Sequence, residues 1–321
     1  MKTTANIDAT MTCMKCDVRC QRFGKHRNGL RRFRCPQCKK TYTEPHQLTL
    51  GEMYVSEEKI VLALRMLLEG NSIRSTMRIT ELDSNTITKA LVLPGERCEK
   101  VMARLIINVP VKDVQCDEIW SFIQKKEKRV QPGDDPNFGD AYCFTAIERH
   151  SKLILNFALG KRDQRTTDAF IEGLRHATAS SNFQITTDGF APYRSAISNT
   201  LEDRVDFAQL IKVYAATPEG ERRYSPAEVV NTEVVPVIGE PDPARVCTSH
   251  VERQNLSMRM SIRRFTRLTN AFSKKWENHW AALCLWFGYY NFCRIHSTIR
   301  VTPAMEGGIA DHVWSLAELL A

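Results

Sequence analysis

Two Cys-x-x-Cys pairs near the start of the chain constrain its fold more than any other feature. The first pair is Cys13 and Cys16, and after eighteen residues comes the second, Cys35 and Cys38. Each pair directs two thiolates at one tetrahedral ion, and four thiolates close its coordination sphere. The spacing predicts a zinc ribbon over residues 1–48, in which a structural Zn²⁺ replaces a hydrophobic core that so short a segment cannot supply. Alternative ligands are Cys20, His26 and His46.

The compartment follows from the remaining cysteine usage. The chain has eleven cysteines, an odd number, and its first residues lack an apolar leader segment. Paired cysteines in a reducing compartment are more often metal ligands than disulfides. No run approaches the roughly 18 apolar residues that a membrane span requires. We therefore expect a soluble, cytoplasmic protein with no membrane partner.

The net charge of +8 is concentrated around the cysteine pairs. Residues 13–40 include ten lysines and arginines and a single acid, Asp17. Clustered positive charge is typical of a surface that binds a polyanion, although a solvated basic face is the alternative. The candidate DNA-contacting residues here are Arg31, Arg32 and Arg34.

Residues 49–110 carry three helical patterns. Ser56 is a plausible N-cap of the first, a short second pattern runs from Ser72 to Thr80, and the third opens at Asp83. A short helix, a tight turn and a helix that begins with small polar residues are typical of a helix-turn-helix, although such helical triplets also occur without DNA binding. In this interpretation Asn85 and Lys89 face the DNA groove.

From residue 111 the pattern changes to alternating apolar strands. We expect strands over residues 114–123, 140–148, 153–159, 183–187 and 205–214, with helices over 166–179 and from Pro192. This is the order of the ribonuclease H-like fold, a mixed sheet flanked by helices. Residues 215–248 contain five prolines and little periodicity, which predicts a long loop or insertion. The prediction is thus an α+β multidomain protein with a catalytic core over 111–300 and a C-terminal tail over 301–321.

Three carboxylates fall where this fold would bring them together. Asp117 lies within the first strand, Asp188 at the end of the fourth, and Glu252 early in a late helix. Mutual repulsion makes such a cluster costly unless cations neutralise it. Mg²⁺ prefers oxygen ligands, and two ions about 4 Å apart can activate the attacking oxygen and stabilise the leaving oxygen at phosphorus. The three residues are therefore candidate magnesium ligands and catalytic residues.

Each carboxylate also has a simpler explanation. Glu118 competes with Asp117, but strand alternation points it to the opposite face, where we expect it to be exposed. Asp188 is also explained as a turn residue before Gly189, and Glu252 as a partner for the dipole of its own helix.

A basic run follows Glu252. If residues 249–276 are helical, Glu252, Arg259 and Arg263 share one face. That arrangement suits a carboxylate that holds a metal ion and arginines that hold phosphates.

These motifs together resemble the DDE transposases of bacterial insertion sequences, most closely the insertion-sequence-one group. The resemblance covers nearly the whole chain and rests on the cysteine pairs, on residues 117–122 (DEIWSF), on residues 187–189 (TDG), and above all on residues 252–256 (ERQNL) continuing to Lys274. It implies that Asp117, Asp188 and Glu252 bind the catalytic metals and that Arg259 assists DNA binding. Because one continuous frame covers both halves, it also implies the single-frame form.

The leading hypothesis is a transposase that binds the inverted-repeat ends of its element, cleaves them and joins the 3′ ends to target DNA. Its partners are expected to be double-stranded DNA and further copies of the chain on that DNA, in a bacterial, nucleoid-associated setting. One rival is a domesticated or inactive regulator that uses only the zinc ribbon and helix-turn-helix. Another is a nuclease without strand transfer.

Overall fold

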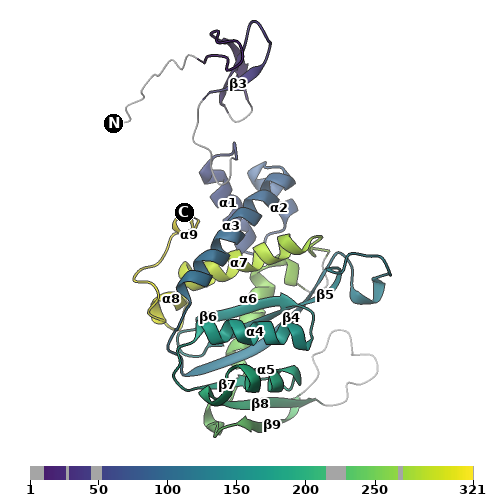
Figure 1. The fold of residues 1–321 in the computed structure, drawn as a ribbon, viewed down its shortest axis with the longest axis vertical. Coiled ribbons are helices and arrows are strands. Elements are labelled where there is room, and N and C mark those ends of the chain that lie inside the picture. The colour runs from purple at the N-terminus through teal and green to yellow at the C-terminus, as the bar shows by residue number, and fades with distance from the viewer. Residues whose placement is uncertain (1–10, 27–28, 45–52, 215–228, 267–269, 321) are drawn as a thin grey trace. The chain divides into compact units, whose positions relative to one another are not determined.

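The computed structural model describes residues 11–26, 29–44, 53–214, 229–266 and 270–320 (Figure 1). The chain divides into two compact units, Met1–Ile60 and Val61–Ala321. The division falls within helix α1 (Glu57–Leu68).

The first unit is a small antiparallel sheet built around cysteines. Its strands are β1 (Gln21–Lys25), β2 (Arg31–Arg34) and β3 (Thr41–Thr43), in that order. The buried cluster consists of Cys13, Cys20, Phe33 and Cys35. With one aromatic side chain and three thiols, this core is too small to be stable by apolar burial alone, which agrees with the expected dependence on a metal.

The three predicted helices after the ribbon are present. They are α1, α2 (Ile73–Thr80) and α3 (Ser84–Leu105). The side chain of Ser72 caps α2 by accepting from the backbone N–H of Ser75 at 3.1 Å. The side chain of Asp83 caps α3 by accepting from the backbone N–H of Asn85 at 2.8 Å. Whether they act as a helix-turn-helix on DNA stays a prediction.

Helix α3 packs directly against α7 (Trp276–Phe292), the central helix of the second unit. The two backbones approach so closely at Gly95 that a Cβ there would lie 2.6 Å from Cα of Ala281. Only glycine fits this crossing. Helix α7 is apolar on nearly all sides, as expected of a helix buried between other elements.

The second unit contains a six-stranded mixed sheet in the order β6-β5-β4-β7-β8-β9 (Figure 1). Five strands match the predicted ones: β4 (Asp113–Ile123), β5 (Gly139–Glu148), β6 (Ile154–Gly160), β7 (Phe183–Thr187) and β8 (Val205–Tyr214). Strands β4, β7 and β8 run parallel, whereas β5 and β6 run antiparallel to their neighbours. This mixed α+β architecture is consistent with the expected ribonuclease H-like fold.

The expectation of a loop over residues 215–248 is wrong for residues 229–238. These form β9 (Val229–Ile238), an edge strand antiparallel to β8, while residues 215–228 lie outside the described part of the chain. Most of β9 is exposed, so no alternation of apolar and polar residues reveals it in the sequence. Pro236 is tolerated because it sits beside a register shift on an edge strand.

Helices cover both faces of the sheet. On one face lie α4 (Gln164–Ala177) and α5 (Pro192–Thr200), where Phe144 of β5 contacts Phe170 and Tyr193 with ring centroids 5.7 and 6.3 Å apart. The other face carries α6 (Ser249–Ser261) and α7, and there Phe157 of β6 stacks on Phe287 at 4.4 Å. Strand β4 is therefore covered on both sides.

The basic run after Glu252 is only partly helical. Helix α6 ends at Ser261 because Ile262 adopts an extended conformation, and a 3-10 turn over Arg263–Phe265 follows. Arg263 therefore does not continue the helical face of Glu252 and Arg259, as the sequence suggested.

Two short helices, α8 (Pro303–Glu306) and α9 (Leu316–Leu319), follow α7 and pack on it. Among the described residues, no helix has the length and apolar character needed to cross a bilayer.

Candidate active site

The pairing of β4 with β7 brings Asp117 and Asp188 together. Cys116 pairs with Thr187, the last residue of β7, in the parallel register, so Asp117 of β4 and Asp188, which follows β7, lie at the same level. Carboxylate oxygens of Asp117, Glu118 and Asp188 lie within 4.8 Å of one another. We call these three residues the acidic group.

Asp117 accepts two hydrogen bonds, and its pKa is raised. Its Oδ2 accepts from the side-chain amide of Asn255 at 2.8 Å, and its Oδ1 accepts from the backbone N–H of Glu118 at 2.8 Å. Burial, followed by the negative charges of Glu118 and Asp188, raises the pKa of Asp117 to about 7, and the charge of Glu252 adds to this. A cation beside Asp117 would relieve that repulsion.

Glu118 was expected to be exposed, and that expectation is wrong. Its side chain is 4% exposed, and its carboxylate accepts from Nε of Arg162 and, at 3.2 Å, from the hydroxyl of Tyr193. Strand alternation does point Glu118 away from Asn255, but that face is covered by α4 and α5 rather than by water. Burial raises the pKa of Glu118, as does the charge of Asp188, whereas Arg162 opposes both.

Asp188 is at once a turn residue and a member of the acidic group. Its Oδ1 accepts from the backbone N–H of Phe190 at 3.0 Å, which closes the turn after β7. Its other oxygen lies 3.6 Å from the guanidinium of Arg162, which sits 3.9 Å above the ring of Phe190. The turn explanation and the functional one are therefore compatible.

Glu252 lies near the acidic group without joining it. It sits in the first turn of α6, where its Oε1 accepts from Lys212 of β8 and from the hydroxyl of Thr248 at 2.6 Å. Its side chain is 44% exposed. Asn255, three residues further along the helix, makes the direct contact with Asp117.

Sequence reasoning missed four polar residues around these carboxylates: Arg162, Tyr193, Lys212 and Asn255. Only Asn255 carried a signal, since it belongs to the motif at residues 252–256. The others lie in segments whose local pattern gives no reason to single them out.

The four predicted zinc ligands come together in the first unit. Sulfur atoms of Cys13, Cys16, Cys35 and Cys38 lie within 4.8 Å of one another, and the sulfurs of Cys13 and Cys38 are 3.6 Å apart. A hydrogen bond with the Tyr42 hydroxyl lowers the pKa of the Cys13 thiol to about 6. Four thiols at this spacing fit a closed, four-coordinate metal site.

The alternative ligands do not join this thiol group. Cys20 is buried but lies outside it, and a ring nitrogen of His26 lies 3.0 Å from the Thr43 hydroxyl. His46 lies outside the described residues.

The candidate DNA-contacting residues occupy different surroundings. Arg32 and Arg34 extend over the ring of Phe23, 5.3 and 5.0 Å from its centroid, whereas Arg31 lies 3.9 Å from the Glu44 carboxylate. In the second unit Asn85 and Lys89 are exposed near the start of α3, Arg259 is half-buried on α6, and Arg263 is exposed beyond it.

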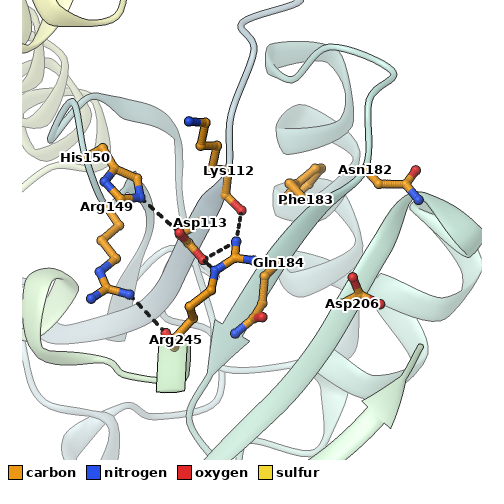
Figure 2. Close-up of a pocket in the computed structure, with 9 residues that line it drawn as sticks. All are labelled: Lys112, Asp113, Arg149, His150, Asn182, Phe183, Gln184, Asp206 and Arg245. Carbon is orange, nitrogen blue, oxygen red and sulfur yellow. Dashed lines mark hydrogen bonds and ion pairs between the residues drawn. The ribbon is translucent and has the colours of Figure 1, made fainter. Parts of the chain in front are cut away.

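A cavity of about 540 Å³ lies where β4 and β7 begin, away from the acidic group (Figure 2). At its wall, buried Asp113 accepts from Nε of Arg245 at 2.8 Å, and its other oxygen lies 3.0 Å from Nε2 of His150. Arg149 also approaches, and donates to the backbone carbonyl of Arg245 at 3.4 Å. These contacts fix the segment that leads into α6.

Comparison with known proteins adds a family match. Residues 139–217 match the family model for IS240-type transposases, described as a DDE domain, and the matched segment includes Asp188. No curated protein matches the chain.

Among solved structures, the chain is similar to a piggyBac transposase synaptic complex with hairpin DNA, with a TM-score of 0.39 and 9% identity over 85% of this chain and 71% of that chain. A Mos1 transposase paired-end complex with left transposon end gives a TM-score of 0.20 and 10% identity, over 49% of this chain and 60% of that one. Membership of the insertion-sequence-one group stays a prediction. The family model thus identifies a DDE domain over residues 139–217 of this chain.

Proposed function

We propose that this protein is a transposase that binds the inverted-repeat ends of its own insertion sequence, cleaves them, and joins the 3′ ends to target DNA by two-metal phosphoryl transfer. Asp117, Asp188 and Glu252 are the proposed metal ligands. The observation that carries this proposal is the position of Asp117, level with Asp188 across two parallel strands and close enough to Glu252 for its charge to raise the Asp117 pKa.

The donor set fits divalent magnesium. All of the groups that converge are carboxylates, the hard oxygen ligands that Mg²⁺ prefers. Within the group, repulsion and burial already favour a neutralising cation. When bound, the metal supplies activation of the attacking oxygen and stabilisation of the leaving one. Glu118 is a candidate for a further ligand, because its oxygens belong to the same cluster.

The chain's own residues hold this geometry. Asn255 fixes one oxygen of Asp117, the backbone N–H of Phe190 fixes one oxygen of Asp188, and Arg162 bridges Asp188 and Glu118. Carboxylates held in this way keep their orientation with little rearrangement when a cation and a phosphate arrive.

DNA recognition is assigned to the N-terminal modules. The four-cysteine group supports a zinc ribbon, and the capped helices α2 and α3 support a helix-turn-helix with Asn85 and Lys89 toward DNA. Arg31, Arg32, Arg34, Arg259 and Arg263 are proposed phosphate contacts. We further propose that the enzyme acts as a homo-oligomer on DNA.

The test is a cleavage and strand-transfer assay on DNA that carries the element's own terminal sequence. We expect Mg²⁺-dependent nicking that exposes 3′ hydroxyls, followed by joining to target DNA. Asp117→Ala, Asp188→Ala and Glu252→Ala should each abolish both steps and leave end binding nearly intact. Specific end binding by an inactive wild type would favour the regulator, and cleavage without joining would favour the nuclease.

A further inference from the structure

Helix α6 begins without a cap of its own. Thr248 occupies the N-cap position, but its hydroxyl donates to the carboxylate of Glu252 at 2.6 Å and makes no side-chain capping bond. The first backbone N–H groups of a helix have no acceptor within the helix, and leaving them unpaired when buried is costly. An acceptor must come from elsewhere in the fold.

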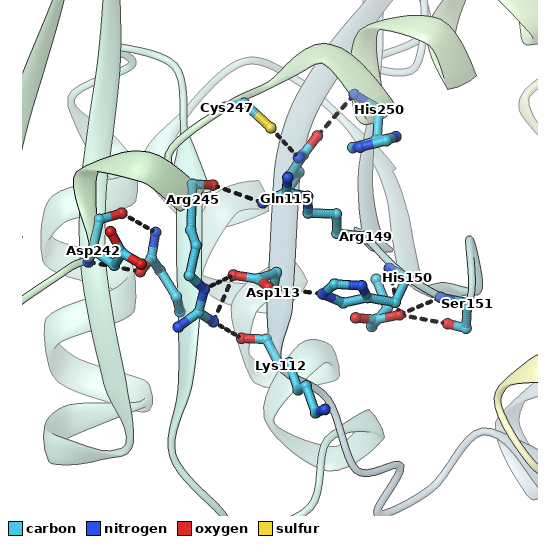
Figure 3. Close-up of polar contacts among 12 residues, drawn as sticks. Lys112, Asp113, Gln115, Arg149, His150, Ser151, Asp242, Arg245, Cys247 and His250 are labelled. Carbon is cyan, nitrogen blue, oxygen red and sulfur yellow. Dashed lines mark hydrogen bonds and ion pairs between the residues drawn. The ribbon is translucent and has the colours of Figure 1, made fainter.

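Gln115 of β4 supplies that acceptor. Its Oε1 accepts from the backbone N–H of His250 at 2.9 Å, and its Nε2 donates to the sulfur of Cys247 at 2.9 Å (Figure 3). The same Oε1 accepts from the backbone N–H of Val251 at 3.2 Å. The side chain is almost completely enclosed, with Gln115 only 2% exposed. A strand residue thus caps the helix that carries Glu252.

A second contact between β4 and α6 lies further along both the strand and the helix. Asp117, on the same face of β4 as Gln115, accepts from Asn255 at 2.8 Å. Two residues of strand span about 6.7 Å. From His250 or Val251 to Asn255, four or five residues of helix span about 6–7.5 Å. The two contacts therefore fit together, and Glu252 lies between their helix residues.

The connection before the helix is anchored by the same strands. Asp113, two residues before Gln115, binds Arg245 through its carboxylate (Figure 3). Gln184 of β7 exchanges hydrogen bonds with the backbone of Asp242 at 2.9 and 3.2 Å. Neither contact touches α6 itself. Of Asp113, Gln115 and Gln184, it is Gln115 that bonds to the backbone of the first turn of α6, which carries Glu252.

We propose that Gln115 is a positioning residue, whose side-chain cap fixes the register of α6 on β4 and so the distance of Glu252 from Asp117 and Asp188. This inference rests on the proposed function, because it assigns Glu252 to the same metal site. Gln115 is enclosed beneath the first turn of α6 and is bonded to its backbone. It acts through the helix backbone.

In the experiment, Mn²⁺ is titrated into the full-length, zinc-loaded protein, and electron paramagnetic resonance measures how much of it is bound. Three variants are compared with the wild type. Gln115→Met keeps the volume and removes the acceptor, so the half-saturating Mn²⁺ concentration should rise about tenfold. Gln115→Glu retains a side-chain oxygen that can accept from the backbone N–H groups of His250 and Val251. Its half-saturating Mn²⁺ concentration should therefore be close to the wild-type value.

Gln184→Met is the matched control, because Gln184 is equally buried and also loses two bonds to backbone. It should lower the melting temperature and leave the Mn²⁺ titration unchanged. Hydrogen exchange adds a readout independent of metal, since the amides of residues 250 and 251 should exchange faster in Gln115→Met alone.

The outcomes separate this inference from the function beneath it. An unchanged Mn²⁺ titration in Gln115→Met, or an equal rise in Gln184→Met, would overturn the positioning role while wild-type cleavage stands. A wild type that neither binds Mn²⁺ nor cleaves would overturn the proposed function, and the positioning role with it.

Discussion

Lys212 of β8 forms an ion pair with Glu252 of α6, and the Thr248 hydroxyl donates to the same carboxylate oxygen. Glu252 is therefore engaged by two donors while Asp117, Glu118 and Asp188 cluster beside it. Any cation that recruits Glu252 to the acidic group has to compete with the ammonium of Lys212.

Replacing Lys212 tests this competition. We expect Lys212→Met to lower the half-saturating Mn²⁺ concentration of the DNA-free protein a few-fold. Without the Lys212 ammonium, the Glu252 carboxylate can bind Mn²⁺ without first breaking an ion pair. Electron paramagnetic resonance of added Mn²⁺ measures it. Lys161→Met is the control, since Lys161 pairs with Glu127 at 2.9 Å in an exposed bridge. Weaker binding in Lys212→Met would mean instead that Lys212 holds Glu252 in its metal-binding position.

Asp117 and Glu118, the neighbouring acids on β4, should respond differently to replacement by the corresponding amide. Asp117→Asn should abolish cleavage, because an amide cannot balance the charge of a divalent cation. Glu118→Gln still offers an acceptor to Arg162 and Tyr193 and should stay within about tenfold of wild type. Single-turnover cleavage of end DNA, with end binding measured in parallel, distinguishes them. If Glu118→Gln were as inactive as Asp117→Asn, Glu118 would have to be counted among the ligands.

The zinc site offers a comparison between two buried cysteines. Cys35→Ser should abolish stoichiometric zinc and unfold the β1–β3 unit, because a site that has lost one thiolate no longer supplies its folding energy. Cys20→Ser should keep one zinc, since Cys20 lies outside the thiol group. Metal content and far-ultraviolet circular dichroism report the two effects. Loss of zinc in Cys20→Ser would place Cys20 among the ligands.

Salt dependence should distinguish the arginines of β2. Arg32 and Arg34 lie over Phe23, whereas Arg31 has a carboxylate neighbour in Glu44. The log of the DNA-binding constant falls linearly with the log of the salt concentration. Neutralising Arg32 or Arg34 should make this slope less steep by about 0.9 each, and Arg31→Gln should change it by less. Fluorescence anisotropy with end DNA and random DNA gives the slopes. Equal slopes in all variants would exclude phosphate contacts by this strand.

Buried His279 should make the protein sensitive to acid. Its ring nitrogens lie 3.0 Å from the Ser121 hydroxyl and 2.8 Å from that of Ser273, and burial, with the charge of Arg264, lowers its pKa to about 3. Between pH 6.5 and about 3 the unfolded chain binds this proton and the folded chain does not. The free energy of unfolding should therefore fall with decreasing pH by about 1.4 kcal/mol per unit from this group.

Urea denaturation of the wild type and His279→Gln at pH 7, 6 and 5 measures that contribution. The variant should be less stable at pH 7 by about 1–3 kcal/mol, because buried hydrogen bonds are lost. The difference should shrink at lower pH, since glutamine does not titrate. Parallel stability curves would show that folding does not lower the pKa of His279.

Much of the fold was predictable because its elements have characteristic patterns of residues close together in the sequence. Cysteine spacing identified the thiol group, the strand pattern located β4 to β8, and helical patterns located α1 to α3. These signals depend only on residues near one another in the chain. The exposed strand β9 lacks such a pattern and was missed.

The site required the tertiary structure. Strand alternation correctly separated Asp117 from Glu118, but whether the second face meets water or Tyr193 depends on a helix about 75 residues further along the chain. In the same way, the partners of Glu252 and of Gln115 come from distant strands and helices. The sequence determined which carboxylates were available and on which elements they lie. Their burial, their counter-ions and the cap of α6 were decided only when the sheet and helices packed together, because those interactions join residues that no local pattern relates.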